Sequence, residues 1–441
     1  MRPRTSSPYQ RGNSPRGPPV CSPASPRETG RPSPPRRTRA QLLCAGQGLS
    51  MLGSGAAAIA LPLLVLRVTA SPLSVGLVEA VWTGALALAC LPAGPVVDRF
   101  DRRTLLLVCE AGRAVTSAAL AAAVLTGRAS LPVLLVAGVV LGFLTAPFNA
   151  AGLASVRQVV PESKLSTALA VNQVRGQLAF LVGPVLGGVL YQLSPSLPFW
   201  LDAASFVVSA VCVRALGTAL RVPESERELQ GWRQSFTAGL RFLWADRLLR
   251  DLALVASAQN FVFDGVYLAI VVVCARHGTS GASIGLLTAT SAAGAMTGVL
   301  LAPRVSRRLS PAGVLLGTEV LCALLVTAMA VGGAPAVLAV LLAGCALAVS
   351  VSGSVMTVAR MLRTPPRLQG RVNSAIGLLF MATPPLGSTL AGLLLDSLSD
   401  GAVFLVLGAL LAVLALFLPR ATTFGRPPRP LEAGAKAEAG V

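Results

Sequence analysis

The sequence has 441 residues, of which 54% are hydrophobic and 12% are charged, and its formal net charge is +19. Soluble domains carry about 25% charged residues, so this chain lacks the charged coat that a water-soluble protein of its length needs. A nucleic-acid-binding protein would gather its basic residues on one polar domain, whereas here most of them lie between apolar runs. Composition therefore favours a membrane protein, and the excess of Arg over Lys is typical of a GC-rich bacterial genome.

Cysteine and histidine give no pattern typical of a metal site. The eight cysteines show no CxxC or other ligand spacing, and the chain has one histidine, His277. Seven of the cysteines fall in or at the end of apolar runs, where a small buried hydrophobic side chain is the simpler interpretation. We expect no disulfide framework, no metal site and no cofactor.

The chain begins with a cationic segment. Residues 1–40 hold nine Arg, ten Pro and six Ser without apolar periodicity, which predicts a disordered cytoplasmic tail. The apolar run that follows, 42–66, is too long for a secretion signal and lacks an A-x-A cleavage site. It is predicted to be the first membrane span.

Eleven further apolar runs approach the ~20 residues that cross a bilayer. They lie at 75–97, 104–125, 131–151, 168–191, 199–216, 252–274, 282–301, 311–331, 336–358, 372–395 and 401–418. An even number of crossings brings both termini to one side, and if that side is the cytoplasm, 32 of the 37 basic residues lie inside. We therefore predict an all-α, multi-pass protein of the bacterial plasma membrane with both termini cytoplasmic.

The connection 221–251 divides the chain into two six-helix halves, 41–220 and 252–418, and residues 419–441 form a second cytoplasmic tail. Within that connection, apolar residues recur at helical spacing and predict an amphipathic helix lying on the cytoplasmic membrane face. These residues are Trp232, Phe236, Leu240 and Leu243.

The two halves repeat each other. VNQVRG at 171–176 recurs as VNSAIG at 372–377, Pro184 matches Pro385 at the same offset, and Glu110 matches Glu319. Repeated six-helix halves are typical of transporters in which one half rocks against the other around a central site.

The connection between spans two and three reads GPVVDRFDRR at 94–103. It resembles the G-x-x-x-D-R-x-G-R-R loop motif of the major facilitator superfamily, with Asp101 where glycine is usual. The motif residues are Gly94, Asp98, Arg99, Arg102 and Arg103. The resemblance covers residues 42 to about 418 and implies the major facilitator fold. Asp98 could act as a latch that pairs with an arginine or with a helix N-terminus and biases one of two conformations; alternatively, these charges only set topology and solvate a turn.

Two further segments resemble the exporter branch of this superfamily. GPVLGG in span five, with Gly183, Pro184, Gly187 and Gly188, is similar to the antiporter motif of drug:proton exporters, although close helix packing alone would also favour it. The segment 239–250, GLRFLWADRLLR, resembles the branch that includes macrolide and siderophore efflux proteins. The resemblance implies proton-coupled efflux.

Ionisable groups inside the membrane are costly and mark functional sites. Asp264 lies near the middle of span seven, with Asn260 and Tyr267 on the same helix face. In the superfamily this span lines the central cavity, along with spans one, four and ten. A carboxylate in apolar surroundings can take up and release a proton near neutral pH, so Asp264 is predicted to be the proton-coupling group. The alternative is a structural hydrogen bond to a neighbouring helix.

Other charges within the spans have several interpretations. Glu110 and Arg113 lie three residues apart and are expected to neutralise each other. Glu319 lacks such a partner, because Cys322 takes the equivalent position, so it either pairs across helices or carries a proton. Arg175 is a candidate for an interhelical pair or a contact with an anionic substrate. Glu79 and Asp202, near the outer ends of their spans, are expected to be solvated.

A mostly apolar cavity with few polar anchors suits hydrophobic drugs better than sugars. Its predicted lining includes Gln47, Ser50, Ser54, Asn149 and Phe261. Two positions that are often charged in exporters are neutral here, within Leu52–Ser54 and Phe148–Gly152. Coupling therefore rests on Asp264 alone or is absent.

The sequence predicts a secondary transporter that exports hydrophobic or amphipathic small molecules by alternating access, as a multidrug antiporter does. A nutrient importer on the same fold, a polytopic membrane enzyme and a transporter-like sensor are the alternatives. A membrane enzyme would need clustered catalytic groups, and neither lysine follows the glycines of a phosphate-binding loop. The expected partners are a small-molecule substrate, the lipid bilayer and the proton, with no nucleic acid, and the chain is expected to be a monomer.

Overall fold

The computed structural model describes residues 36–159, 162–215, 232–365 and 368–421. Every regular element in these ranges is an α-helix, and twelve spans are long and apolar enough to cross a membrane. The expected all-α architecture with twelve transmembrane helices is confirmed.

The described chain contains fourteen helices. The first six are α1 (Arg36–Thr69), α2 (Pro72–Arg99), α3 (Arg102–Leu125), α4 (Leu131–Val159), α5 (Glu162–Leu193) and α6 (Leu197–Ala215). The next four are α7 (Trp232–Ala245), α8 (Arg247–Arg276), α9 (Gly281–Arg308) and α10 (Pro311–Ala328). The last four are α11 (Pro335–Arg363), α12 (Gln369–Ala382), α13 (Pro384–Ser397) and α14 (Asp400–Ala421).

Several boundaries differ from the sequence expectation. Helix α1 begins at Arg36, inside the predicted tail, and α8 begins at Arg247, inside the predicted central connection. The eleventh span is two helices, because Pro384 and Pro385 carry no backbone N–H to continue the hydrogen bonding of α12 and instead start α13. Most of both predicted tails, residues 1–35 and 422–441, lies outside the described residues.

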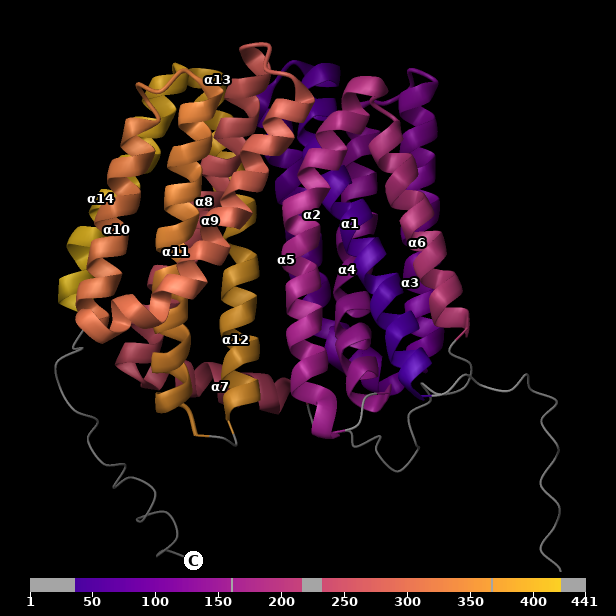
Figure 1. Ribbon diagram of the computed structural model, residues 1–441, viewed down its shortest axis with the longest axis horizontal. Helices are drawn as coiled ribbons and strands as arrows, with labels where there is room; N and C mark the ends of the chain where they lie inside the picture. Colours follow the sequence, from indigo (N-terminus) through magenta and orange to yellow (C-terminus); the bar gives the residue numbers. More distant parts are fainter. Residues whose placement is uncertain (1–35, 160–161, 216–231, 366–367, 422–441) are drawn as a thin grey trace, which may run out of the picture. The chain divides into compact units, whose positions relative to one another are not determined.

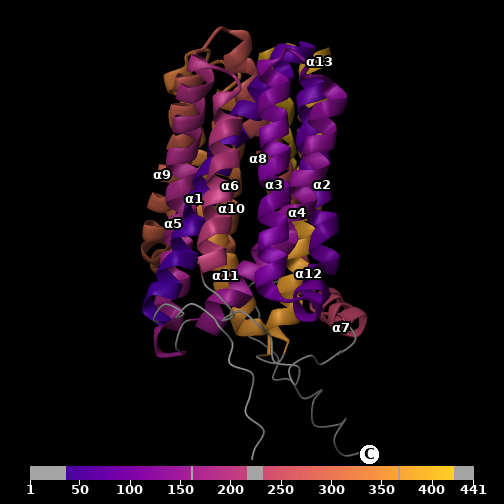
Figure 2. The same ribbon diagram turned by 90° about the vertical axis from the view of Figure 1, so that its right-hand side faces the viewer.

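Helices α1–α6 form one half of the bundle (the N-half) and α8–α14 the other (the C-half), with α7 lying across one end (Figures 1 and 2). We call the end at which α1 begins and α14 ends the terminus side, and the opposite end the far side. The two halves meet along two helix pairs, α2 with α13 and α5 with α9. The internal repeat relates α2 to α9 and α5 to α13. It therefore maps one of these pairs onto the other, as a pseudo-two-fold arrangement requires.

The apolar core joins the two halves only toward the far side. One buried cluster there includes Val65 of α1 and Val75 of α2 together with Val266 and Ile270 of α8. On the terminus side each cluster in the described part of the chain belongs to one half: α1, α2, α3, α4 and α6 share one, and α7, α8 and α12 share another. The far side is therefore packed closed, while the halves have separate cores on the terminus side.

Close approach between backbones supports the same conclusion. A Cβ atom added to Gly188 of α5 would lie 2.1 Å from the carbonyl oxygen of Gly281 in α9, and one added to Gly76 of α2 would lie 2.3 Å from the carbonyl oxygen of Ser388 in α13. Only glycine fits at such contacts. By contrast, a Cβ at Gly176, near the terminus side of α5, would meet nothing within 4 Å.

The predicted amphipathic helix exists as α7, but its described apolar side packs on protein. Leu243 is fully buried with Leu249 of α8 and Ile376 of α12, and Gly239 lies against the carbonyl of Arg371. The side chains of Trp232 and Phe236 lie outside the described residues, so the position of α7 on the membrane face stays a prediction. An apolar stripe looks the same in sequence whether it covers lipid or a neighbouring helix.

Candidate functional site

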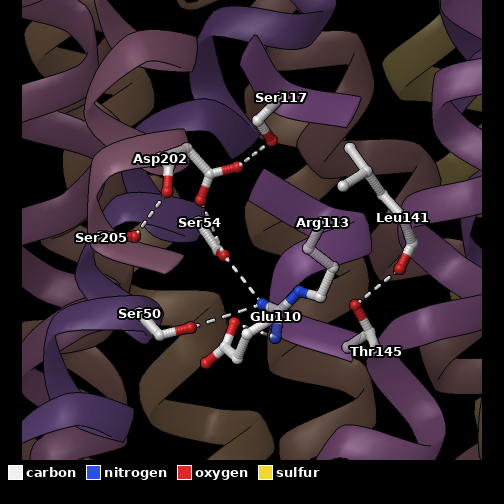
Figure 3. A network of polar contacts seen from close by, with 9 residues as sticks. All are labelled: Ser50, Ser54, Glu110, Arg113, Ser117, Leu141, Thr145, Asp202 and Ser205. Carbon is white, nitrogen blue, oxygen red and sulfur yellow. Dashed lines mark hydrogen bonds and ion pairs between the residues drawn. The ribbon is translucent and has the colours of Figure 1, made fainter. Parts of the chain in front are cut away.

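A buried polar network connects α1, α3 and α6 in the N-half (Figure 3). At its centre, the guanidinium of Arg113 lies 3.5 Å from Oε2 of Glu110, and the two side chains are 6% and 0% exposed. The rings of Phe148 and Phe206 flank the guanidinium, with centroids at 4.7 and 4.0 Å, a geometry that stabilises the cation. The predicted pairing of Glu110 with Arg113 is confirmed.

Asp202 of α6 belongs to this network, so the expectation that it is solvated is wrong. It is 3% exposed, and its carboxylate accepts hydrogen bonds from Ser54 at 3.1 Å and from Ser117 at 2.8 Å. The sequence placed it near a span end, but its side chain points toward α1 and α3 (Figure 3). Ser54 of α1 and Ser117 of α3 are the polar residues in the sequence that could have indicated a buried acid here.

The predicted cavity-lining residues of span one have other contacts. Ser50 and Ser54 accept hydrogen bonds from Arg113 at 3.5 and 3.4 Å, and Gln47 is 7% exposed and packs against Gly152 of α4. These three side chains therefore lie between helices of the N-half, a correction to their predicted role. Asn149 is exposed, while Phe261 is half-buried.

Asp264 lies where the two halves meet. On α8 it is half-buried, and the hydroxyl and backbone N–H of Ser388 in α13 face its carboxyl group. Glu79, on α2 of the other half, lies close enough for the two charges to interact. Tyr267 is within range of both acids and faces the hydroxyl of Thr288. The structure thus brings Asp264 and Tyr267 together as predicted.

Glu79 adds an acid that sequence reasoning left out of this site. It is half-buried and not simply solvated, which corrects the expectation. The two carboxyl groups come from different halves, so any movement between the halves changes their separation. We call Glu79, Asp264 and Tyr267 the seam cluster. Asn260 lies one turn before Asp264 on α8 and is half-buried.

A second contact across the halves lies at the far side. Oδ2 of Asp396, at the end of α13, accepts hydrogen bonds from the Ser71 hydroxyl at 3.1 Å and from the backbone N–H of Leu73 at 3.3 Å. Ser71 is the N-cap of α2, so Asp396 caps a helix of the opposite half, where the helix dipole favours an anion. Sequence analysis missed this residue.

The loop motif of residues 94–103 orders the start of α3. Asp101, which replaces the usual glycine, is the N-cap of α3 and accepts from the backbone N–H of Thr104 at 2.9 Å and from its hydroxyl at 2.8 Å. Arg103 donates to the last turn of α6, at the carbonyl of Arg214, 3.0 Å away.

The side chain of Asp98 lies outside the described residues, so its predicted latch role stays a prediction. In the same motif, Arg99 is exposed, Arg102 is half-buried, and a Cβ at Gly94 would meet nothing within 4 Å.

The antiporter-like motif of α5 is used for packing on two faces. Gly183 and Gly187 lie against Gly55 and Ala56 of α1, within the N-half. Gly188 and Pro184 contact α9 of the C-half, at Gly281 and Gly285. The motif therefore holds α5 against its own half and against the opposite half at once.

The two remaining candidates lie apart from the seam cluster. Arg175 of α5 donates to the carbonyl of Cys44 in α1, an interhelical contact of the kind expected. Glu319 of α10 is 1% exposed; Gln259 of α8 lies beside it, yet neither carboxyl oxygen has a hydrogen-bond partner among the described residues. No group of three or more His, Cys, Asp or Glu side chains in the described ranges is placed to hold a metal ion.

Twelve spans in two halves, with paired acids where the halves meet, define a polytopic membrane transporter. The sequence matches the model of the Major Facilitator Superfamily over residues 43–360 and 265–440, and the chain belongs to this family. It is 30% identical over 380 residues to the multidrug efflux pump Tap of Mycobacterium tuberculosis (strain ATCC 25618 / H37Rv), covering 81% of this chain and 87% of that one.

Two further comparisons agree with this assignment. The enterobactin exporter EntS of Shigella flexneri is 24% identical over 263 residues, covering 60% of this chain and 62% of that protein. The crystal structure of the nucleoside transporter NupG (D323A mutant) superposes with a TM-score of 0.71 at 13% identity, covering 87% of this chain and all, 100%, of that one. The expected membership of the superfamily is confirmed, and the two relatives agree with the expected exporter branch.

Proposed function

We propose that this protein exports hydrophobic or amphipathic small molecules across the bacterial plasma membrane in exchange for protons, as a monomer with both termini in the cytoplasm. Its similarity to Tap, a multidrug efflux pump, supports the direction and the substrate class. The distribution of basic residues supports the orientation, because most of them adjoin the terminus side.

The observation that carries the proposal is that Asp264 of the C-half lies within electrostatic range of Glu79 of the N-half. Two nearby carboxylates in a low-dielectric region repel each other unless one holds a proton or a cation. A proton bound there stabilises the approach of α2 to α8, and its release favours their separation. Proton binding is thereby linked to the movement between halves that alternating access requires.

In this orientation the conformation described here is closed to the outside. Asp396 and the glycine contacts of α2, α5, α9 and α13 hold the far side together, while the cores of the two halves are separate toward the cytoplasm. An exporter would load its substrate from this state and release it after the far side opens. We propose that Asp98 acts as the corresponding latch of the cytoplasmic side, at the opposite end of α2.

The test is efflux of fluorescent hydrophobic compounds, one cationic and one neutral, from bacterial cells that lack their main exporters. Asp264→Asn and Glu79→Gln are compared with the wild-type chain, with and without a protonophore. We expect the wild type to lower dye retention, and we expect the protonophore and either substitution to abolish this effect. Asp400→Asn, in an acid paired with Arg276 at the far side, is the control and is expected to behave as the wild type.

Dye efflux that survives both substitutions would contradict coupling at the seam cluster. Accumulation of a hexose or nucleoside by cells expressing the chain, with no efflux of either dye, would contradict the exporter proposal and favour an importer.

A further inference from the structure

The buried network of the N-half contains more acid than base. Glu110, Arg113 and Asp202, which we call the triad, are each at most 6% exposed. Fully ionised, these three buried side chains carry one net negative charge. An uncompensated buried charge is strongly unfavourable, so one additional positive charge is needed to balance the triad.

Hydrogen-bond direction identifies Asp202 as the acid that remains a carboxylate. A guanidinium only donates, so the Ser54 hydroxyl accepts from Arg113 at 3.4 Å. Its single proton is then directed at Oδ1 of Asp202, 3.1 Å away. The Ser117 hydroxyl lies 2.8 Å from Oδ2. Asp202 is thus surrounded by donors, which favour its ionised form.

Glu110 has a different environment. Its Oε2 faces Arg113, but its Oε1 is buried without a hydrogen-bond partner among the described residues. The titratable groups that face it are Arg113 and Cys109 of its own helix and Asp202 of α6. The Ser209 hydroxyl of α6 also faces Glu110, and the described neighbours from α1 and α4, Ser50 and Phe148, are uncharged. Ser209 has no hydrogen-bond partner of its own among the described residues, so its hydroxyl is free to accept from a proton on Oε1, and a proton there breaks no existing contact.

We propose that the triad is a proton-binding site of the N-half, distinct from the seam cluster, which holds one proton on Oε1 of Glu110 in this conformation and exchanges it during transport. The inference deepens the proposed function and rests on it for the exchange step. Arg113 is held between Phe148 of α4 and Phe206 of α6, so displacement of either helix against α3 moves the guanidinium relative to Glu110. The proton leaves when this movement tightens the ion pair or admits water.

The protonated state can be tested without transport. Infrared spectra of the full chain in lipid are recorded for the wild type and for Glu110→Gln, which has the shape of a protonated glutamate. We expect their difference to contain the C=O band of one protonated carboxyl group, shifted by ¹³C in glutamate side chains. We expect Asp202→Asn to lose the same band, because Arg113 then balances Glu110 alone. No band in the difference, or a band shifted only by labelled aspartate, overturns the assignment.

The exchange step is tested in proteoliposomes by counting protons moved per molecule of a cationic dye. We expect Glu110→Gln to move fewer protons per dye than the wild type. The control variant, Asp400→Asn, is expected to keep the wild-type ratio. An unchanged ratio in Glu110→Gln would overturn exchange at this site. If the wild type moves dye without protons, the proposed function fails, while the infrared band still decides whether Glu110 is protonated.

Discussion

Asp396 of α13 caps helix α2 of the opposite half, with its Oδ2 atom 3.3 Å from the backbone N–H of Leu73. The contact joins the end of one helix to the start of another, and it is made where the buried core also joins the halves. The equivalent arrangement at the other end of α2 would bring Asp98 to the start of α12. With the latch proposed for Asp98, the two acids would act as alternating caps, one for each conformation.

Removing this cap should favour opening of the far side. Asp396→Ala loses an exposed, charge-assisted contact worth about 1 kcal/mol, which corresponds to a roughly fivefold shift in the ratio of open to closed states. The shift is measured as faster labelling of Val75→Cys, a position that is buried in the closed state, by a membrane-impermeant thiol reagent. Asp396→Asn, which keeps an acceptor oxygen, should have a smaller effect. Equal labelling in all three backgrounds would show that the cap does not hold the far side.

Gly188 should not tolerate a side chain. Gly188→Ala places a methyl group 2.1 Å from the carbonyl of Gly281, and relief of such overpacking costs about 1–3 kcal/mol. We expect a lower midpoint of thermal unfolding in detergent, or easier far-side opening measured by the same labelling. Gly176→Ala on the same helix meets open space and serves as the control. If both variants match the wild type, α5 and α9 are not in the close contact described.

Asp101 should stabilise the start of α3. Asp101→Ala removes the N-cap hydrogen bond to Thr104 and is expected to lower the free energy of unfolding by about 1 kcal/mol. Asp101→Gly restores the residue usual in the superfamily. It should lower the free energy of unfolding by only about a few tenths of a kcal/mol, since glycine is itself an accepted N-cap. Denaturant unfolding of the two variants provides the measurement. A larger loss for glycine than for alanine would contradict the capping role.

The superfamily motif could be read from sequence because its residues are contiguous, and so could the twelve spans, because each is a long apolar run. The replacement at Asp101 could not be interpreted, since an N-cap depends on where α3 begins. The eleventh span was predicted as one helix, but Pro384 and Pro385 divide it into two. Pro184, by contrast, leaves α5 continuous. Two consecutive prolines remove two backbone donors, whereas the single proline of α5 removes one.

Polar contacts within one helix could be predicted from the sequence, whereas those between helices could not. Glu110 and Arg113 are neighbours on one helix, so spacing sufficed. Asp202 and Glu79 depend on which helices face them, and a single sequence carries no record of such long-range pairs. Both looked solvated from their position near span ends, whereas α1 and α3 surround Asp202, and α8 lies beside Glu79.

Arg113 should be the residue of the triad least tolerant of substitution. Arg113→Met leaves the buried Asp202 carboxylate without its cation, and breaking a buried pair in this way costs about 3–5 kcal/mol. We expect poor expression or a strongly lowered unfolding midpoint. The double variant Arg113→Met, Asp202→Asn should recover part of the loss, because the carboxylate left without a cation is then neutral. No recovery in the double variant would contradict electrostatic coupling between the two residues.

The most direct test of proton-coupled export is transport by the purified protein in liposomes across an imposed pH gradient. The account predicts that a fluorescent hydrophobic cation crosses the membrane against the direction of proton flow, and that collapsing the gradient stops it. Asp264→Asn should abolish gradient-driven movement while retaining dye binding. Dye movement by the wild type that is indifferent to the pH gradient, or full coupling in Asp264→Asn, would contradict the account.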